Sequence, residues 1–331
     1  MAQQKAPLHG IITAMVTPLK DQTTLDHAGL ERLIEHLIAG GVHGIFPLGT
    51  TGEAPALPVE LRNEIVELTC HQVAGRVPVV IGVTDTSLVA ATRLAQKAKD
   101  AGAFAIASAP PYYYSLTQDE ILHYFEELVG QAGIPMLIYN QPGNTHHTIS
   151  VDTVWRAAQI ENIVGLKDSG LLMSYFHEVR ASLVGRDDFT LLIGPDGLLA
   201  ECVLLGGNGG MAAGSNVYPR LFVDLYNAAS AGDIPHVVRL HEEAIAFGKA
   251  IYHGNNPLRG LKWGLELLGI CSSVLTEPLA KLTAKESAIV ERYIDQNRSL
   301  MLRQGHCESG GEPARPSEPK TLVGVADSLQ S

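Results

Sequence analysis

Short apolar segments alternate with longer amphipathic segments along the first 230 residues of the chain. Each short segment is rich in Val, Ile or Leu without regular alternation, which is typical of strands buried on both faces. The longer segments carry apolar residues at helical spacing, as in a stripe at positions 30, 33, 34, 37 and 38. The pattern predicts eight strand–helix repeats, with strands at 11–17, 42–48, 77–83, 103–109, 135–140, 163–167, 189–193 and 207–214.

Eight repeats of this kind predict an α/β fold in which the strands close into a (β/α)8 TIM barrel, which needs roughly 200–250 residues. An open, doubly wound sheet is the competing architecture. Its usual phosphate-binding fingerprint, GxGxxG directly after the first strand, is absent, because that place reads Thr17, Pro18 and Leu19. We therefore expect a catalytic barrel over residues 1–230.

The pattern changes after residue 230, where only helical segments follow. One apolar stripe runs over 234–251, and two more helical segments lie at 258–270 and 286–302. They predict a C-terminal helical subdomain over residues 231–304, packed on the barrel as a cap. From residue 305 the chain is rich in Glu, Ser, Gly and Pro, which predicts a disordered tail over 305–331. The stripe consists of Ile234, Val237, Val238, His241, Ala244, Ile245 and Ile251.

The composition disfavours several classes of protein. The chain has 331 residues, of which 46% are hydrophobic, and its net charge of -11 disfavours a nucleic-acid partner. No apolar run approaches the roughly 20 residues of a membrane span, and the first residues lack the apolar core of a signal peptide. The four cysteines lie far apart without a CxxC pair, which suits a reducing compartment. We expect a soluble, cytoplasmic protein with no nucleic-acid or membrane partner.

Lys167 has the most informative position of all the lysines. It follows Ile-Val-Gly-Leu in a predicted buried strand, and the carboxyl ends of the strands carry the reactive groups in a barrel of this kind. A buried lysine is costly unless it is paired or neutral, and a neutral lysine attacks carbonyl groups to form a Schiff base. The alternative is a structural ion pair, with Asp168 or with another carboxylate.

Two other strand ends carry candidate groups. The sequence Gly-Thr-Thr-Gly-Glu at 49–53 offers the hydroxyls of Thr50 and Thr51 to a carboxylate or phosphate. Alternatively, a threonine there caps the following helix. Tyr139 ends another strand, where its hydroxyl could transfer a proton to a lysine-bound substrate, although such a tyrosine is more often part of the core. The three tyrosines at 112–114 are as compatible with packing as with chemistry.

A metal site is disfavoured. His146 and His147 are adjacent, so on a strand they would point to opposite sides and could not easily bind one ion. No HxH, HExxH or His–carboxylate cluster lies at a predicted strand end. A metal-dependent aldolase is therefore the less favoured alternative, and we expect no metal.

Taken together, these motifs resemble the dihydrodipicolinate synthase/N-acetylneuraminate lyase family over about residues 8–300. They occur in the family's order along the eight strand–helix units, and their combination is specific although no single motif is. The motifs are GTTGE at 49–53, PYY at 111–113, YNQPG at 139–143, GLKD at 165–168, and Asn256 and Pro257 ahead of Lys262.

The resemblance implies a class I aldolase or lyase that forms a Schiff base with pyruvate or another 2-oxo acid. By this analogy Lys167 is the nucleophile and Tyr139 is the proton shuttle. Thr50 links Tyr139 to Tyr113, which the family supplies from a neighbouring subunit, and together with Thr51 it holds the 2-oxo acid carboxylate. Family members are commonly homotetramers, built as a dimer of dimers, and need neither a metal nor an organic cofactor. The family lines its second-substrate pocket at the positions of Gly194, Asp196 and Met211.

One position departs from the family's lysine-forming synthases. In those enzymes the loop after the fifth strand carries an arginine that binds the distal carboxylate of the aldehyde, and here that position is Asn144. A neutral amide cannot form the bidentate clamp of a guanidinium, although Arg220, after the eighth strand, could restore it. An amide can hydrogen-bond hydroxyl groups, so the loop favours a 2-oxo-3-deoxy sugar acid as substrate.

We therefore expect an aldolase that joins or separates pyruvate and an aldehyde. One alternative is 4-hydroxy-tetrahydrodipicolinate synthase, which uses pyruvate and aspartate semialdehyde. Another is a Schiff-base dehydratase or deaminase of a 2-oxo acid, since the same lysine and tyrosine would serve it. A catalytically silent binding barrel is the third, and it has no need of a desolvated lysine beside a phenol.

Overall fold

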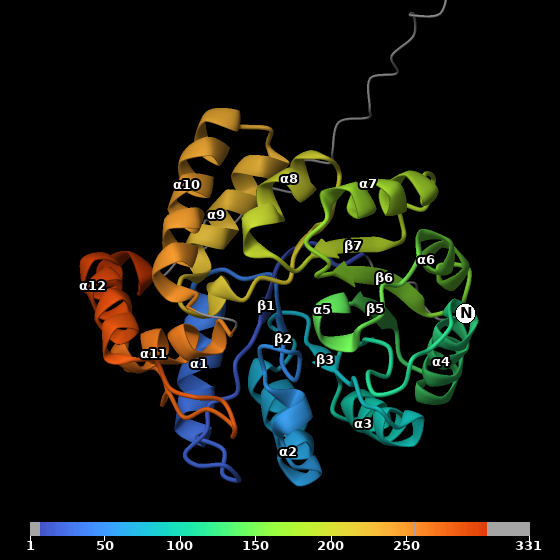
Figure 1. The fold of residues 1–331 in the computed structure, drawn as a ribbon, viewed down its shortest axis with the longest axis horizontal. Helices are drawn as coiled ribbons and strands as arrows, with labels where there is room; N and C mark the ends of the chain where they lie inside the picture. Colours follow the sequence, from blue (N-terminus) through green and yellow to red (C-terminus); the bar gives the residue numbers. More distant parts are fainter. Residues whose placement is uncertain (1–6, 254–255, 303–331) are drawn as a thin grey trace, which may run out of the picture.

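A computed structural model describes residues 7–253 and 256–302 of the protein. Within these residues, eight parallel strands form a central ring that is surrounded by helices (Figure 1). Each strand overlaps one of the eight predicted segments, so that prediction is confirmed. The strands are β1 (Gly10–Ala14), β2 (Gly44–Phe46), β3 (Val80–Gly82), β4 (Ala105–Ser108), β5 (Met136–Asn140), β6 (Ile163–Asp168), β7 (Thr190–Ile193) and β8 (Gly209–Gly210).

The ring of strands is closed. β1 pairs with β2 on one side and with β8 on the other, and the remaining strands pair in sequence order from β3 to β8. A parallel bridge between Ile45 and Val79 joins β2 to the start of β3, and Gly82 N donates to Pro47 O at 3.0 Å. An open sheet would leave two unpaired edges. The barrel prediction is therefore confirmed and the doubly wound alternative is wrong.

The helices cover the outside of the barrel and bury one face each. In α1 the predicted stripe is buried, with Leu30, Leu33, Ile34 and Leu37 facing the barrel, and the Asp26 side chain caps the first turn. The barrel helices are α1 (His27–Ala39), α2 (Val59–Val73), α3 (Leu88–Asp100), α4 (Gln118–Ala132), α5 (Pro142–Thr145), α6 (Val151–Ala157), α7 (Met173–Ser182), α8 (Leu199–Leu204) and α9 (Pro219–Ser230). Three short 3-10 turns join them: η1 (Ala54–Ala56), η2 (Asp196–Leu198) and η3 (Gly214–Asn216).

Apolar side chains fill the inside of the barrel. They form a cluster of their own, separate from the larger core between the strands and the helices. Because apolar side chains fill the interior, the polar groups of the site lie at the carboxyl ends of the strands. The interior cluster consists of Leu8, Ile12, Ala14, Phe46, Val80, Ala105, Ala107, Leu137, Leu192 and Met211.

Strand β8 is much shorter than its predicted segment. A Cβ atom on Gly209 would lie 2.0 Å from the carbonyl oxygen of Gly10, and the φ angle of Gly209 is +145°. Only glycine allows β8 to approach β1 this closely. The two-residue strand therefore completes the ring, and the chain turns away directly after it.

The C-terminal helices α10 (Ile234–Ile251), α11 (Leu258–Leu267) and α12 (Ala284–Met301) follow the barrel. In Figure 1 they lie beside α1 and α9, at the left of the view, with α10 packed along α9. The predicted change to an all-helical pattern after residue 230 is thus observed. The predicted tail over 305–331 lies outside the described residues.

The buried face predicted for α10 is partly wrong. Val237, Ala244 and Ile251 are buried as expected, but Ile234 and Val238 are 50% and 53% exposed. The true contact face also contains Leu240 and Phe247, and the other core members of the helix are Val237, Ala244, Ala250 and Ile251. Apolar residues of α10 lie around more of the helix than the face that contacts its neighbours. Their spacing alone therefore predicted a buried face that includes the exposed Ile234 and Val238.

The described residues contain no helix that is both long enough and apolar enough to cross a membrane. Cys70, Cys202 and Cys271 are buried free thiols, and Cys307 lies outside the described residues. Burial raises the pKa of Cys70 to about 11 and that of Cys271 to about 12. These thiols therefore behave as small core side chains and not as nucleophiles.

Candidate active site

Lys167 lies at the carboxyl end of β6 with 3% of its surface exposed. Its Nζ atom lies 4.1 Å from the ring centroid of Tyr139 and 4.7 Å from that of Phe46. In the part of the chain that the structure describes, no carboxylate oxygen lies within 4.0 Å of this nitrogen. The ion-pair alternative with Asp168 is therefore wrong.

The pairing of β5 with β6 brings the lysine and the tyrosine together. Tyr139 is opposite Lys167 in the parallel register, and Asn140 is opposite Asp168. Because successive side chains point to opposite faces of a strand, the first pair faces the barrel interior and the second faces the helices. Asn140 Nδ2 donates to Asp168 Oδ1 at 2.8 Å, and Asn140 Oδ1 accepts from Ile149 N at 3.0 Å. This outer pair fixes the register of the inner pair.

The hydroxyl of Tyr139 has two hydroxyl neighbours. Thr50 Oγ1 lies 3.4 Å from it, and Ser169 Oγ donates to it at 3.5 Å. Burial raises the pKa of Tyr139, but the nearby Lys167 ammonium and the hydrogen bonds from Ser169 and Thr50 outweigh this, so its pKa lies below the usual value of 10.0. A phenol with a lowered pKa beside an amine can exchange protons with a substrate bound to that amine.

Sequence reasoning missed Ser169. It follows the Lys167–Asp168 pair directly, and a residue just past a strand end could have been included for that reason. A Cβ atom on Gly194 would lie 2.0 Å from Ser169 Oγ. The glycine predicted to line the second-substrate pocket therefore leaves the space that the Ser169 hydroxyl occupies.

Thr50 and Thr51 lie on a tight loop after β2. Thr50 is exposed and Thr51 is half-buried, and the loop lies between Leu48 and Glu53, which both adopt left-handed backbone angles, with φ of +58° and +59°. The capping residue of η1 is Glu53 and that of α2 is Pro58, and neither makes a side-chain capping bond. The alternative of a threonine cap is thus wrong.

Tyr113 lies on the surface of the single chain. Its side chain is 77% exposed, its ring packs edge-on against that of Tyr114 at 5.1 Å, and among the described residues it forms no hydrogen bond to Thr50. The hydroxyl chain from Tyr139 therefore ends at Thr50 in the described residues.

The predicted second-substrate residues lie at different depths. Asn144 is exposed on α5, just after β5, while Met211 is buried in the interior cluster. The guanidinium of Arg220 pairs with Asp224 of its own helix at 3.0 Å.

Asp196 holds the ends of β7 and β8 together. Its carboxylate accepts backbone N–H bonds from Ala213 at 3.1 Å and Gly214 at 2.8 Å, and a hydrogen bond from the Tyr252 hydroxyl. Burial raises the pKa of Asp196, although these hydrogen bonds oppose the rise. The Asp196 carboxylate therefore joins the segment after β8 to Tyr252.

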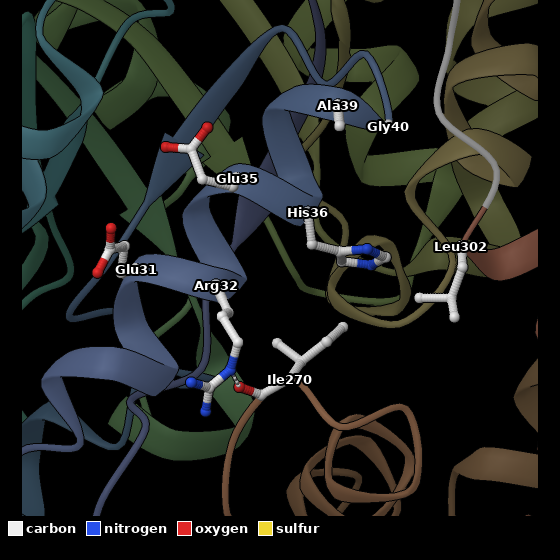
Figure 2. A pocket seen from close by; sticks show the side chains of 8 residues that line it. All are labelled: Glu31, Arg32, Glu35, His36, Ala39, Gly40, Ile270 and Leu302. Atoms are coloured by element: carbon white, nitrogen blue, oxygen red, sulfur yellow. Dashed lines mark hydrogen bonds between the residues drawn. The ribbon is translucent and has the colours of Figure 1, made fainter.

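Two other features lie away from these strand ends. Within residues 7–253 and 256–302, no group of three or more His, Cys, Asp and Glu side chains could hold a metal ion. A cavity of about 470 Å³ lies between α1 and the C-terminal helices. There Arg32 Nε donates to Ile270 O at 2.8 Å, and the His36 ring points toward Leu302 (Figure 2). Burial lowers the pKa of His36 to about 4. This cavity contains none of the residues around Lys167.

Comparison with known proteins assigns a family to this arrangement. The model of the dihydrodipicolinate synthetase family matches residues 7–297. A 4-hydroxy-tetrahydrodipicolinate synthase from Gluconacetobacter diazotrophicus is 35% identical over 273 residues, which cover 82% of this chain and 91% of that relative.

Solved structures agree with this family. The dihydrodipicolinate synthase from Bacteroides thetaiotaomicron is 42% identical, with a TM-score of 0.85 over 88% of this chain and 99% of that one. YagE, a prophage protein from E. coli that belongs to the dihydrodipicolinic acid synthase family and was solved in complex with pyruvate, is 29% identical. Its TM-score is 0.84 over 88% of this chain and 99% of that one. The chain therefore belongs to the dihydrodipicolinate synthetase family and is a lyase of the Schiff-base aldolase type.

Proposed function

We propose that this lyase joins or separates pyruvate, or a closely related 2-oxo acid, and an aldehyde through a Schiff base on Lys167. The observation that carries the proposal is the placement of Lys167 Nζ 4.1 Å from the ring of Tyr139, at the carboxyl end of a filled barrel. A lysine without a carboxylate partner beside a phenol is the pair that imine chemistry needs. The complex of YagE with pyruvate supports the choice of 2-oxo acid.

The proposed reaction uses only groups of the protein. The neutral amine of Lys167 attacks the ketone carbon of the 2-oxo acid, and loss of one water gives a protonated imine. In cleavage this iminium accepts the electron pair of the bond that breaks and becomes an enamine. In condensation the pyruvate iminium first loses a proton from its methyl carbon, and the enamine so formed attacks the aldehyde. Tyr139 gives and takes the protons of these steps. The hydroxyls of Thr50 and Thr51 hold the carboxylate, and no cofactor takes part.

The aldehyde is proposed from the polar groups near the strand ends. Asn144 and Ser169 offer an amide and a hydroxyl, which suit a polyhydroxylated aldehyde such as that released from a 2-oxo-3-deoxy sugar acid. Asn144 stands where a guanidinium would bind a distal carboxylate, and its neutral amide cannot form that bidentate clamp.

A second candidate is condensation of pyruvate with aspartate semialdehyde. The relatives favour it, since the protein from Gluconacetobacter diazotrophicus that is 35% identical is named a 4-hydroxy-tetrahydrodipicolinate synthase. A dehydratase or deaminase would use the same lysine and tyrosine, and only the products distinguish it.

The test is to supply the purified enzyme with each substrate class and to identify the products by mass spectrometry. Release of pyruvate and an aldehyde from a 2-oxo-3-deoxy sugar acid, with little consumption of aspartate semialdehyde, is the expected result. Efficient condensation of pyruvate with aspartate semialdehyde would favour the second candidate. Loss of water or ammonia without cleavage of a carbon–carbon bond would identify a dehydratase or deaminase.

The assembly is also part of the proposal. The exposure of Tyr113 on the single chain supports a homotetramer, built as a dimer of dimers, in which a partner subunit supplies this tyrosine to Thr50. The buried free thiols of Cys70, Cys202 and Cys271 suit a reducing compartment such as the cytoplasm.

A further inference from the structure

The proposed reaction leaves one buried pair of charged side chains without a role. Glu53 follows the two threonines of the β2 loop, and Lys262 lies on α11 of the C-terminal subdomain. Their side chains are 1% and 0% exposed, and Lys262 Nζ is in ion-pair contact with Glu53 Oε1. Removing two charges from water is expensive, and an apolar pair of the same size is often at least as stable. Stability alone therefore does not account for this pair.

Each remaining polar atom of the pair is bonded to the segment between α11 and α12. Glu53 Oε2 accepts from the backbone N–H and from the hydroxyl of Thr276, both at 2.8 Å. Lys262 Nζ donates to the carbonyl oxygen of Val274 at 2.6 Å. Gln22 ties the same segment to the β1–α1 connection, because its Nε2 donates to Leu275 O at 2.9 Å. Glu53 is thus anchored to a well-fixed part of the C-terminal subdomain.

The backbone of Glu53 is part of the threonine loop. Its N–H donates to the carbonyl oxygen of Thr50 at 3.1 Å, and its φ angle of +59° is unfavourable for a residue with a side chain. Thr17 Oγ1 donates to Gly52 O at 2.7 Å on the other side of the turn. Such a backbone conformation persists only where the surroundings hold it. The side-chain contacts of Glu53 supply that constraint.

We propose that Glu53 and Lys262 are positioning residues that hold Thr50 and Thr51 at the reacting centre, so that the C-terminal subdomain takes part in binding the 2-oxo acid. This inference rests on the proposed function, because it assigns Thr50 and Thr51 to the substrate carboxylate and to the Tyr139 hydroxyl. The ion pair connects the threonine loop to α11, and these two parts of the chain lie more than 200 residues apart in sequence.

The test uses the full-length double variant Glu53→Gln/Lys262→Met. Each single variant leaves one buried charge without its partner and is prone to misfold, whereas the double variant is neutral and nearly isosteric. The control is Arg186→Gln, which removes an ion pair with Asp188 just before β7, at the opposite end of the barrel from Lys167. Thermal unfolding first shows that both variants fold.

Two measurements then follow the loop and the site separately. The first measurement titrates pyruvate and gives the concentration at which half of the Lys167 side chains carry the borohydride-reduced adduct. We expect this half-saturating concentration to rise at least about tenfold in the double variant, since small displacements of binding groups have large effects, and to stay unchanged in the control.

The second measurement is hydrogen exchange of the backbone amides over 48–57. These should exchange faster in the double variant, while the amides of β5 and β6 keep their rates.

The two measurements distinguish the failure of this inference from that of the proposed function. If the wild type forms no adduct, the proposed function fails, while faster loop exchange in the double variant still supports the coupling of the loop to the subdomain. Unchanged exchange over 48–57 overturns the inference. An unchanged half-saturating concentration, in an enzyme whose wild type does form the adduct, overturns it as well.

Discussion

Several side chains converge on the phenol of Tyr139. Lys167 Nζ lies over its ring, and the hydroxyls of Thr50 and Ser169 lie 3.4 and 3.5 Å from its oxygen. Tyr139→Phe keeps the ring beside the amine and removes only the atom that transfers protons. We expect turnover to fall roughly 10²–10⁴-fold, while pyruvate can still be trapped on Lys167. A variant with wild-type turnover would make Tyr139 an ordinary core tyrosine.

Ser169 lowers the pKa of this phenol through its hydrogen bond. Burial acts in the opposite direction and raises the pKa, so removing the Ser169 hydroxyl shifts the pKa of Tyr139 upward. In Ser169→Ala the limb of the pH–rate profile that reports Tyr139 should move to higher pH. Turnover should fall roughly two- to tenfold, as expected for a net hydrogen bond of about 0.5–1.5 kcal/mol. The control is Ser182→Ala, whose hydroxyl bonds only to Val179 O within α7, and a profile that moves equally in both variants would contradict the assignment.

At the scale of strands and helices, the pairing of β5 with β6 determines the geometry of the site. The outer pair of this register, Asn140 and Asp168, is buried, and among the described residues no hydrogen-bond partner of Asp168 Oδ2 is found. Burial raises the pKa of Asp168 above 3.8, while the bonds from Asn140 and Gly170 partly oppose this. The folded state therefore binds this proton more tightly than the unfolded state does. The protonated Asp168 carboxyl stabilises the folded state at pH values below its ordinary pKa. This stabilisation is lost as the pH rises through the raised pKa of the folded state.

Asp168→Asn should reveal this linkage. The variant keeps an oxygen acceptor for Asn140 and removes the buried charge. Its free energy of unfolding, relative to that of the wild type, should increase as the pH rises from about 4 to about 8. Urea unfolding at several pH values measures this difference. A difference that is constant with pH, or that decreases, would show that the pKa of Asp168 is not raised.

The elements themselves were largely predictable from sequence, for physical reasons. The eight strands stand out because both faces are buried, so each reads as an apolar run. Lys167 could be assigned a role because it is the one charged residue in such a run. The contact face of α10 was misplaced because Ile234 and Val238 are apolar without being covered. Spacing shows how a helix could be amphipathic, while its neighbours decide which face is covered.

At the scale of the whole molecule, the site depends on contacts that no local pattern contains. The bond from Thr276 to Glu53 spans 223 residues, and the pairing of Asn140 with Asp168 depends on the register of two strands. Neither could be inferred from spacing, because charged residues with no periodic signal are usually solvated. The exposure of Tyr113 is a further case, since the proposed assembly gives it a partner in another copy of the chain.

The proposed assembly gives a prediction at this scale. If a partner subunit supplies Tyr113 to Thr50, then Tyr113→Phe should lower turnover without changing the thermal midpoint, because the side chain is 77% exposed in the single chain. Dilution that dissociates the assembly should lower the wild-type rate to a similar degree. Sedimentation velocity alongside activity at each concentration checks this. A dissociated monomer with full activity would contradict the proposal.

Trapping the Schiff base shows whether Lys167 is the nucleophile. The wild type and Lys167→Ala are incubated with pyruvate and borohydride, and the intact mass and the modified peptide are determined. We expect one reduced pyruvate on Lys167 in the wild type and none in the variant, which should remain folded but inactive. An adduct on another lysine, or substantial turnover by Lys167→Ala, would contradict the account.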